Sequence, residues 1–266
     1  MGESVYLSKN LTADQLQFMR VIEEHEVLYF DMARIEAQVG HRWGNLNEVL
    51  ENLVHKKLLL RLERGKYTRT EFQDRNVLTS FISDGGVISY WSALHQHGLT
   101  DRFPNTLFVK TPKRKKSKKL LNTPIRFVTV TPRKMVGRFN VGYGDKSYPM
   151  TDTEATILDC FDHHRYAGEW SDLLRAFHQA SMDGHQLTKY ALAYQNLSAF
   201  KRLGYLAELL DKKGLENFIE IAQNHLGKEY TLFDPTGPDN GKYLGRWKLR
   251  LNLTEEQILN IIENLY

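Results

Sequence analysis

The segment NLNEVLENLVHKKLLLRLERGKYTRT, residues 45–70, decides the fold of the first part of the chain. Its first half predicts a helix, because leucine or valine recurs at positions 46, 49, 50, 53 and 54, which lie on one helical face. Its second half predicts two strands, residues 58–63 and 67–70, joined by a tight turn at Arg64-Gly65-Lys66. An amphipathic helix followed by a basic two-stranded ribbon is typical of the end of a winged helix-turn-helix domain.

Two further helices are expected before this segment. The first begins after Thr12, which has Gln15 three residues on, the spacing of a capping box. Its expected inner face holds three apolar residues, Leu16, Met19 and Ile22. The second helix covers about residues 30–39 and ends at Gly40. The order helix, helix, glycine turn, helix and ribbon therefore predicts a winged helix-turn-helix domain over residues 1–73.

This domain offers a candidate DNA-binding surface. The residues expected in the major groove, at the start of the third helix, are Arg42, Trp43, Asn45 and Asn47. Asparagine suits adenine edges and arginine suits guanine, whereas Trp43 fits the core equally well. The residues expected to contact phosphate from the ribbon are Arg61, Arg64, Lys66 and Arg69. The alternative is a winged helix that makes only protein contacts.

The charge distribution favours the DNA-binding interpretation. The 266 residues carry a net charge of only +4. Residues 1–41 hold three cations and seven carboxylates, whereas residues 42–69 hold seven cations and three carboxylates. Residues 71–150 hold 14 cations against five carboxylates, and residues 151–266 hold 12 against 17. A segregated basic surface fits a polyanionic partner, although helix faces also segregate charge for solubility.

A second domain is expected after a linker. A short helix over residues 75–82 and the turn Asp84-Gly85-Gly86 place the linker at residues 74–86, and the second domain at residues 87–266. That domain is expected to open with one helix over 87–98. Strand-like segments follow, at residues 107–109, 125–130, within 140–150, and at 230–233 and 246–251. Helices are expected over residues 153–163, 169–181, 187–195, 197–211 and 214–226, and from Glu255 onward with Thr254 as cap. The predicted class is α+β: a winged helix-turn-helix domain followed by a mixed α/β domain with a small sheet and several helices.

A basic run interrupts the strands of the second domain. Seven cations fall between Lys110 and Lys119 without a carboxylate. Such a block is expected to be solvated rather than packed. We expect an accessory basic patch that faces either DNA or another partner, formed by Lys113, Arg114, Lys115, Lys116, Lys118 and Lys119.

No motif demands catalysis. The segment from Asp159 to His164 concentrates possible metal ligands, but no second cluster with the usual ligand spacing completes a site, and a buried Cys160 suits the core. The glycines at 142 and 144 miss the spacing of a phosphate-binding loop, and a glycine-containing hairpin explains them better. Asp152 is expected to cap the helix that follows it. We therefore expect no enzyme activity, no metal and no cofactor.

The remaining features concern location. The single cysteine, the absence of an apolar run of 18 residues and a start without a signal sequence predict a cytoplasmic protein with no membrane contact. We expect a monomer in solution.

Several segments together resemble the AbiEi-type antitoxins, described as transcriptional regulators of bacterial viral defence systems. These segments occur in the family's order and cover most of the chain: Leu58–Tyr67, Ile88–Leu99, Thr151–Asp162, Ala199–Leu206 and Arg246–Asn252. One difference is the basic run, which is longer and more basic than the family pattern.

The resemblance implies a transcriptional autorepressor that binds repeats in its own promoter. It also implies an antitoxin, acting largely through the second domain, that neutralises an AbiEii-type toxin related to nucleotidyltransferases, with or without a stable complex between the two. Two alternatives remain from the residues alone. One is a nuclease or nucleic-acid-modifying enzyme targeted by a winged helix, and the other is a ligand-responsive transcriptional regulator.

Overall fold

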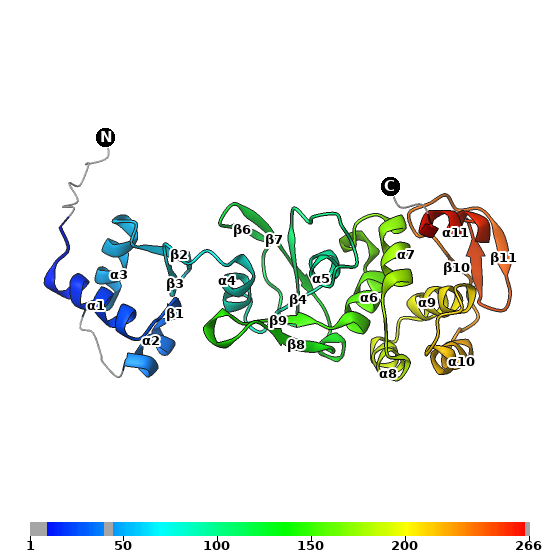
Figure 1. Cartoon of the computed structure of the whole chain (residues 1–266), viewed down its shortest axis with the longest axis horizontal. Coiled ribbons are helices and arrows are strands. Elements are labelled where there is room, and N and C mark those ends of the chain that lie inside the picture. Colours follow the sequence, from blue (N-terminus) through cyan, green and yellow to red (C-terminus); the bar gives the residue numbers. More distant parts are fainter. Residues whose placement is uncertain (1–9, 40–44, 264–266) are drawn as a thin grey trace. The chain divides into compact units, whose positions relative to one another are not determined.

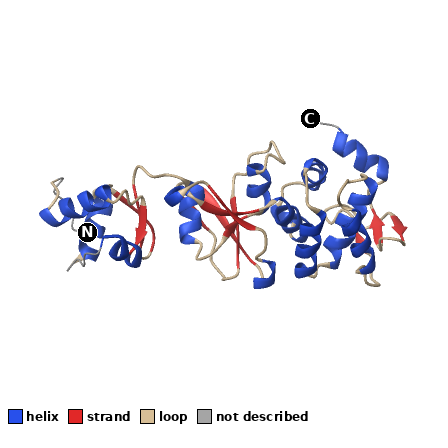
Figure 2. Cartoon of the chain, turned by 60° about the horizontal axis from the view of Figure 1, so that its bottom comes forward, coloured by secondary structure: helices blue, strands red, loops and turns tan. Residues whose placement is uncertain are grey.

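The computed structural model describes residues 10–39 and 45–263, and the chain divides into two units (Figure 1). The first unit comprises residues 1–82 together with residues 143–146, and the second comprises the rest of the chain. Both units mix helices with short strands, so the chain is α+β (Figure 2).

The first unit packs helices against a small sheet. Its elements are α1 (Ala13–Glu24), β1 (Tyr29–Asp31), α2 (Met32–Val39), α3 (Leu46–His55), β2 (Leu59–Glu63), β3 (Lys66–Arg69) and α4 (Arg75–Ile82). The strands form an antiparallel sheet in the order β1-β3-β2. The buried core joins all three of the first helices to the sheet and includes Phe18, Ile22, Phe30, Ile35, Leu50, Leu53 and Leu59. The apolar face predicted for α3 is confirmed, since Leu46, Val49, Leu50 and Leu53 are buried.

Two predictions for the first unit are wrong in detail. Helix α1 begins with the predicted Thr12–Gln15 capping box, but it buries Phe18 and Ile22 and leaves Leu16 41% exposed. The ring of Phe18 packs 5.6 Å from that of Phe30, and this aromatic contact sets the rotation of the helix. Residues 29–31 form a strand rather than the start of a helix, because they pair with β3.

The second unit begins with a six-stranded mixed sheet in the order β6-β7-β5-β4-β9-β8. Its strands are β4 (Val87–Ile88), β5 (Leu107–Thr111), β6 (Lys118–Leu120), β7 (Thr123–Thr129), β8 (Arg138–Val141) and β9 (Tyr148–Thr151). Pairs β5–β7 and β4–β9 are parallel, and the other pairs are antiparallel. The predicted hairpin around residues 142–147 is confirmed by the pairing of β8 with β9.

The expectation of one helix over residues 87–98 is wrong. Val87 and Ile88 are the central strand β4, and helix α5 (Tyr90–Gln96) starts only after Ser89. The chain passes from strand to helix within a single residue. Tyr90, the first residue of the helix, has a left-handed backbone with φ of 56°, and its side chain is fully buried. Two residues of strand between a glycine pair and a helix give too short a pattern to be recognised from sequence.

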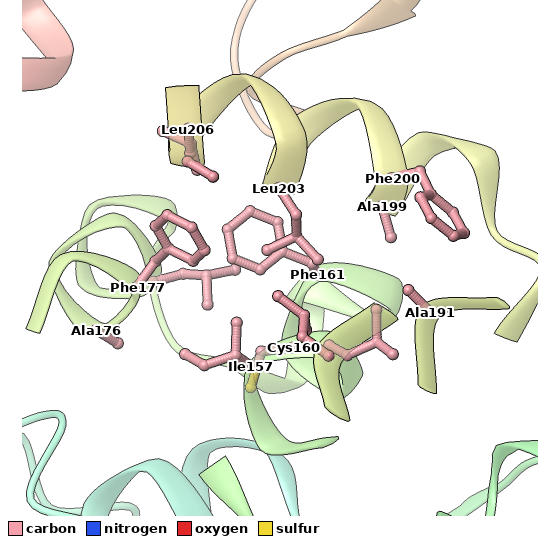
Figure 3. Packing of buried hydrophobic residues seen from close by; sticks show 14 of the residues in the cluster. Ile157, Cys160, Phe161, Ala176, Phe177, Ala191, Ala199, Phe200, Leu203 and Leu206 are labelled. Carbon is pink, nitrogen blue, oxygen red and sulfur yellow. The ribbon is translucent and has the colours of Figure 1, made fainter. Parts of the chain in front are cut away.

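Helices make up most of the rest of the second unit. They are α6 (Thr153–Asp162), α7 (Trp170–Gln179), α8 (Gly184–Tyr194), α9 (Leu197–Leu209), α10 (Glu216–Asn224) and α11 (Glu255–Glu263). The second unit also contains two 3-10 turns, η1 (Pro132–Lys134) and η3 (His164–Tyr166), whereas a further 3-10 turn, η2 (Gly144–Lys146), is grouped with the first unit. The predicted caps of α6 and α11, Asp152 and Thr254, are confirmed. Side chains of α6, α7 and α9 meet in one core, where Phe161, Phe177 and Leu203 lie close together (Figure 3).

A three-stranded sheet lies beside α9 near the carboxyl end. Its strands are β10 (Thr231–Leu232), β11 (Lys242–Leu244) and β12 (Leu249–Leu251), in the order β10-β12-β11. Residues 246–248, expected to be strand, belong to a turn over residues 245–248 that buries Trp247 completely. Two buried cations of α9 fix β10 in place. Lys201 Nζ donates to Glu229 O, and the Arg202 guanidinium donates to Leu232 O at 2.9 Å and Phe233 O at 3.0 Å. Burial lowers the pKa of Arg202 to about 10, which leaves it charged at neutral pH.

Candidate nucleic-acid interface

Helix α3 presents a mixed polar face to solvent. Asn45 occupies the N-cap position and is exposed, although its side chain makes no capping hydrogen bond. Asn47, Glu48 and Glu51 are exposed on the turns that follow, opposite the buried leucines. The outer face of this helix therefore offers two amides and two carboxylates. Arg42 and Trp43, also predicted to contact bases, lie outside the described residues.

The β2–β3 hairpin separates the four predicted phosphate contacts into two pairs. Arg61 and Arg64 are exposed and form no ion pair with any residue that the structure describes. Lys66 is only 16% exposed, because Nζ lies 3.1 Å from Glu63 Oε1 and donates to Phe81 O at 3.2 Å. Arg69 is 20% exposed and pairs with Glu71. Arg61 and Arg64 are therefore available to a ligand, whereas Lys66 and Arg69 make ion pairs within the protein.

The accessory basic patch lies between two strands and is partly ordered by them. Lys113, Arg114, Lys116 and Lys119 are exposed, whereas Lys115 and Lys118 are half-buried. Lys115 Nζ lies 2.9 Å from Asp84 Oδ2. Residues 118–120 form β6, an edge strand that pairs with β7. The expectation that this run is wholly solvated is therefore wrong.

Lys110, the first cation of the run, is the clearest departure from the sequence expectation. Lys110 and Asp159 are each 1% exposed, and Lys110 Nζ lies 2.7 Å from Asp159 Oδ2. The same carboxylate accepts hydrogen bonds from Ser89 Oγ at 2.5 Å and from the Tyr194 hydroxyl. Burial, with Asp159 as a second cause, raises the pKa of Tyr194 well above its usual value. This buried network joins β5, α6 and α8, and no sequence motif indicated it.

The segment from Asp159 to His164 uses its polar groups within the fold. Asp162 Oδ2 accepts a hydrogen bond from Lys134 Nζ at 2.6 Å, and Asp162 Oδ1 accepts one from Asn196 Nδ2 at 2.6 Å. Cys160 is buried as predicted, and burial raises the pKa of its thiol. Burial lowers the pKa of His163. Within the described ranges, no group of three or more His, Cys, Asp and Glu side chains is arranged to hold a metal ion.

Comparison with known proteins bears on the fold alone. No known family model matches the chain, and no curated protein matches it. The fold is similar to that in the crystal structure of the Rv2827c protein from Mycobacterium tuberculosis, with a TM-score of 0.67 and 14% sequence identity over 98% of each chain. Both units of the chain therefore recur in a protein of very different sequence. None of the helices in residues 10–39 and 45–263 is long and apolar enough to cross a membrane.

Proposed function

We propose that the first unit is a winged helix domain that binds duplex DNA. In this proposal α2 and α3 are the helix-turn-helix and the β2–β3 hairpin is the wing. The observation that carries the proposal is the pair of exposed guanidinium groups, Arg61 and Arg64, on a hairpin that follows directly from an amphipathic helix. Arginines free of internal ion pairs are available to phosphate oxygens, and phosphate contacts supply most of the affinity for DNA.

The wing cations have different roles in this proposal. Arg61 and Arg64 contact phosphates and fix the position of the domain on the duplex. Lys66 and Arg69 are already neutralised by Glu63 and Glu71, so they stabilise the hairpin instead.

Helix α3 supplies the base contacts. Asn45 and Asn47 at its start suit adenine edges, and a carboxylate such as Glu51 can accept a hydrogen bond from cytosine N4. Glu48 and Glu51 also repel phosphates, so this helix adds little non-specific affinity and base recognition depends on a good fit. Affinity and sequence preference are therefore divided between the wing and the helix.

The second unit carries the antitoxin role in this proposal, on the strength of the resemblance to AbiEi-type antitoxins. The chain is then a cytoplasmic, non-enzymatic autorepressor that binds repeats in its own promoter and neutralises a nucleotidyltransferase-like toxin. An adjacent gene for such a toxin is the expected genomic context.

The DNA-binding proposal is tested by titrating the full-length protein into a labelled duplex from its own upstream region at several salt concentrations. Each phosphate contact contributes about −0.9 to the slope of log affinity against log salt. The double substitution Arg61→Ala/Arg64→Ala should therefore flatten the slope by about 2 and weaken all sequences alike.

Arg20→Ala is the matched control, because Arg20 is an exposed cation on α1 of the same unit, away from the hairpin. Its slope should equal that of the parent. A double variant that keeps the parental slope, while its thermal midpoint is unchanged, would show that the hairpin does not contact DNA.

A further inference from the structure

The outer face of the β10-β12-β11 sheet carries a row in which two adjacent exposed tyrosines are flanked by cations. Strand pairing places Tyr243 opposite Arg250 and Arg250 opposite Leu232, so these side chains share one face, and Tyr230 lies two residues before Leu232 on that face. Tyr230 is 44% exposed and Tyr243 is 58% exposed. Such exposure is unusual for side chains that bury readily.

The members of the row are in contact with one another. The two tyrosine rings lie 4.9 Å apart, nearly perpendicular. Lys248 Nζ lies 5.2 Å from the centre of the Tyr230 ring, and the Arg250 guanidinium carbon lies 5.3 Å from the centre of the Tyr243 ring. Lys201 and Arg202 hold the backbone of β10 and its neighbours, so the row has a fixed support.

Cations are concentrated at β11 and β12 in an otherwise acidic part of the chain, although one of them, Arg246, pairs with Glu208. Residues 242–250 hold four cations and no carboxylate, whereas residues 151–266 as a whole hold 12 cations and 17 carboxylates. The carboxylate that pairs with Arg250, Asp239, is itself 85% exposed. A polyanion can displace such an exposed pairing at little cost.

We infer that this face binds single-stranded nucleic acid, with bases stacking on Tyr230 and Tyr243 and phosphates contacting Lys248 and Arg250. Surfaces that bind single-stranded nucleic acid commonly combine aromatic rings with cations, because every unpaired base has an open face that can stack on a ring. In a duplex the faces of the bases are stacked on one another, so a duplex would contact only the cations of this surface and not the tyrosine rings. Protein interfaces also favour tyrosine and arginine but are depleted in lysine, so Lys248 is the residue that favours a polyanion over a protein partner. The inference is independent of the proposed DNA contacts of the first unit.

The test measures binding of the full-length protein to a fluorescein-labelled 15-nucleotide oligouridine by anisotropy. The parent should bind, and Tyr230→Ala/Tyr243→Ala should bind at least roughly thirty-fold more weakly, since each lost base stack weakens binding about five-fold or more. Tyr243→Phe should bind like the parent, because the ring and not the hydroxyl is required. Lys248→Ala should reduce the salt slope by about 0.7.

Two controls separate this site from other surfaces. Tyr143→Ala removes a tyrosine that is 93% exposed elsewhere and should bind like the parent. Arg61→Ala/Arg64→Ala should retain parental oligouridine binding even though duplex binding is weakened. Absence of oligouridine binding by the parent, or equal binding by the parent and a folded double-tyrosine variant, overturns the inference.

Discussion

Among individual residues, the buried ion pair of Lys110 and Asp159 has the largest expected effect on stability. Removing two charges from water is costly, and the cost is offset only when the geometry is good and the remaining hydrogen bonds are made. Asp159 meets this condition, because Ser89 and Tyr194 donate to the same carboxylate that Lys110 approaches. Loss of one partner would leave the other as an uncompensated buried charge.

Lys110→Met is therefore expected to lower the free energy of unfolding by about 3–5 kcal/mol, measured by urea denaturation. The matched control is Lys115→Met, which breaks the pair with Asp84, a carboxylate that is 47% exposed. The control should cost less than about 1 kcal/mol, since exposed pairs contribute little. Equal effects of the two substitutions would contradict the structural role given to Lys110.

Among the elements, helix α9 depends on a glycine where it meets the turn that carries Trp247. A Cβ atom at Gly204 would lie 2.3 Å from the Trp247 ring, and this ring is fully buried with its Nε1 donating to Glu208 at 2.6 Å. The close approach of helix to indole is possible only without a side chain at this position.

Gly204→Ala should destabilise the protein by about 1–3 kcal/mol, the usual cost of overpacking. This sign is opposite to the gain of about 0.5–1 kcal/mol that alanine normally gives inside a helix. Gly245→Ala is the control, because a Cβ there would meet only the Tyr230 hydroxyl, at 3.7 Å. Thermal unfolding monitored by circular dichroism distinguishes the two, and a stabilised Gly204→Ala protein would refute the packing described for α9.

For the whole molecule, the division into two units gives a prediction that rests on the proposed function. A fragment that begins at Asp74 lacks α3 and the β2–β3 hairpin but retains every residue of the second unit. It should lose binding to promoter DNA and still rescue cells that express the cognate toxin. Full-length Arg61→Ala/Arg64→Ala should bind promoter DNA more weakly and rescue fully. A fragment that folds, by circular dichroism, yet fails to rescue would show that neutralisation needs the first unit.

Local signals in the sequence predicted much of this architecture, and long-range contacts account for what they missed. The capping box at Thr12, the apolar face of α3, the hairpin turn at Gly65 and the helices after Thr153 depend on neighbours a few residues apart. Lys110 was expected to be solvated because its neighbours in sequence are cations, whereas its partner Asp159 is on α6. The distinction between free and neutralised cations of the hairpin was missed although Glu63 and Glu71 are only two or three residues from Lys66 and Arg69, because the hairpin geometry decides which cation meets a carboxylate.

The hydrogen bonds from Arg202 to β10 have a consequence for how molecules of this protein meet one another. β10 is an outer strand, and its N–H groups at Thr231 and Phe233 point inward to β12, so the Leu232 carbonyl lies on the open side. Open strand edges are templates for pairing with another chain and for aggregation. Because the guanidinium of Arg202 already occupies this carbonyl, a strand from a second molecule finds no acceptor there. A buried arginine thus protects the protein against intermolecular strand addition at this edge, a role for which an exposed charge or a proline is the more common solution.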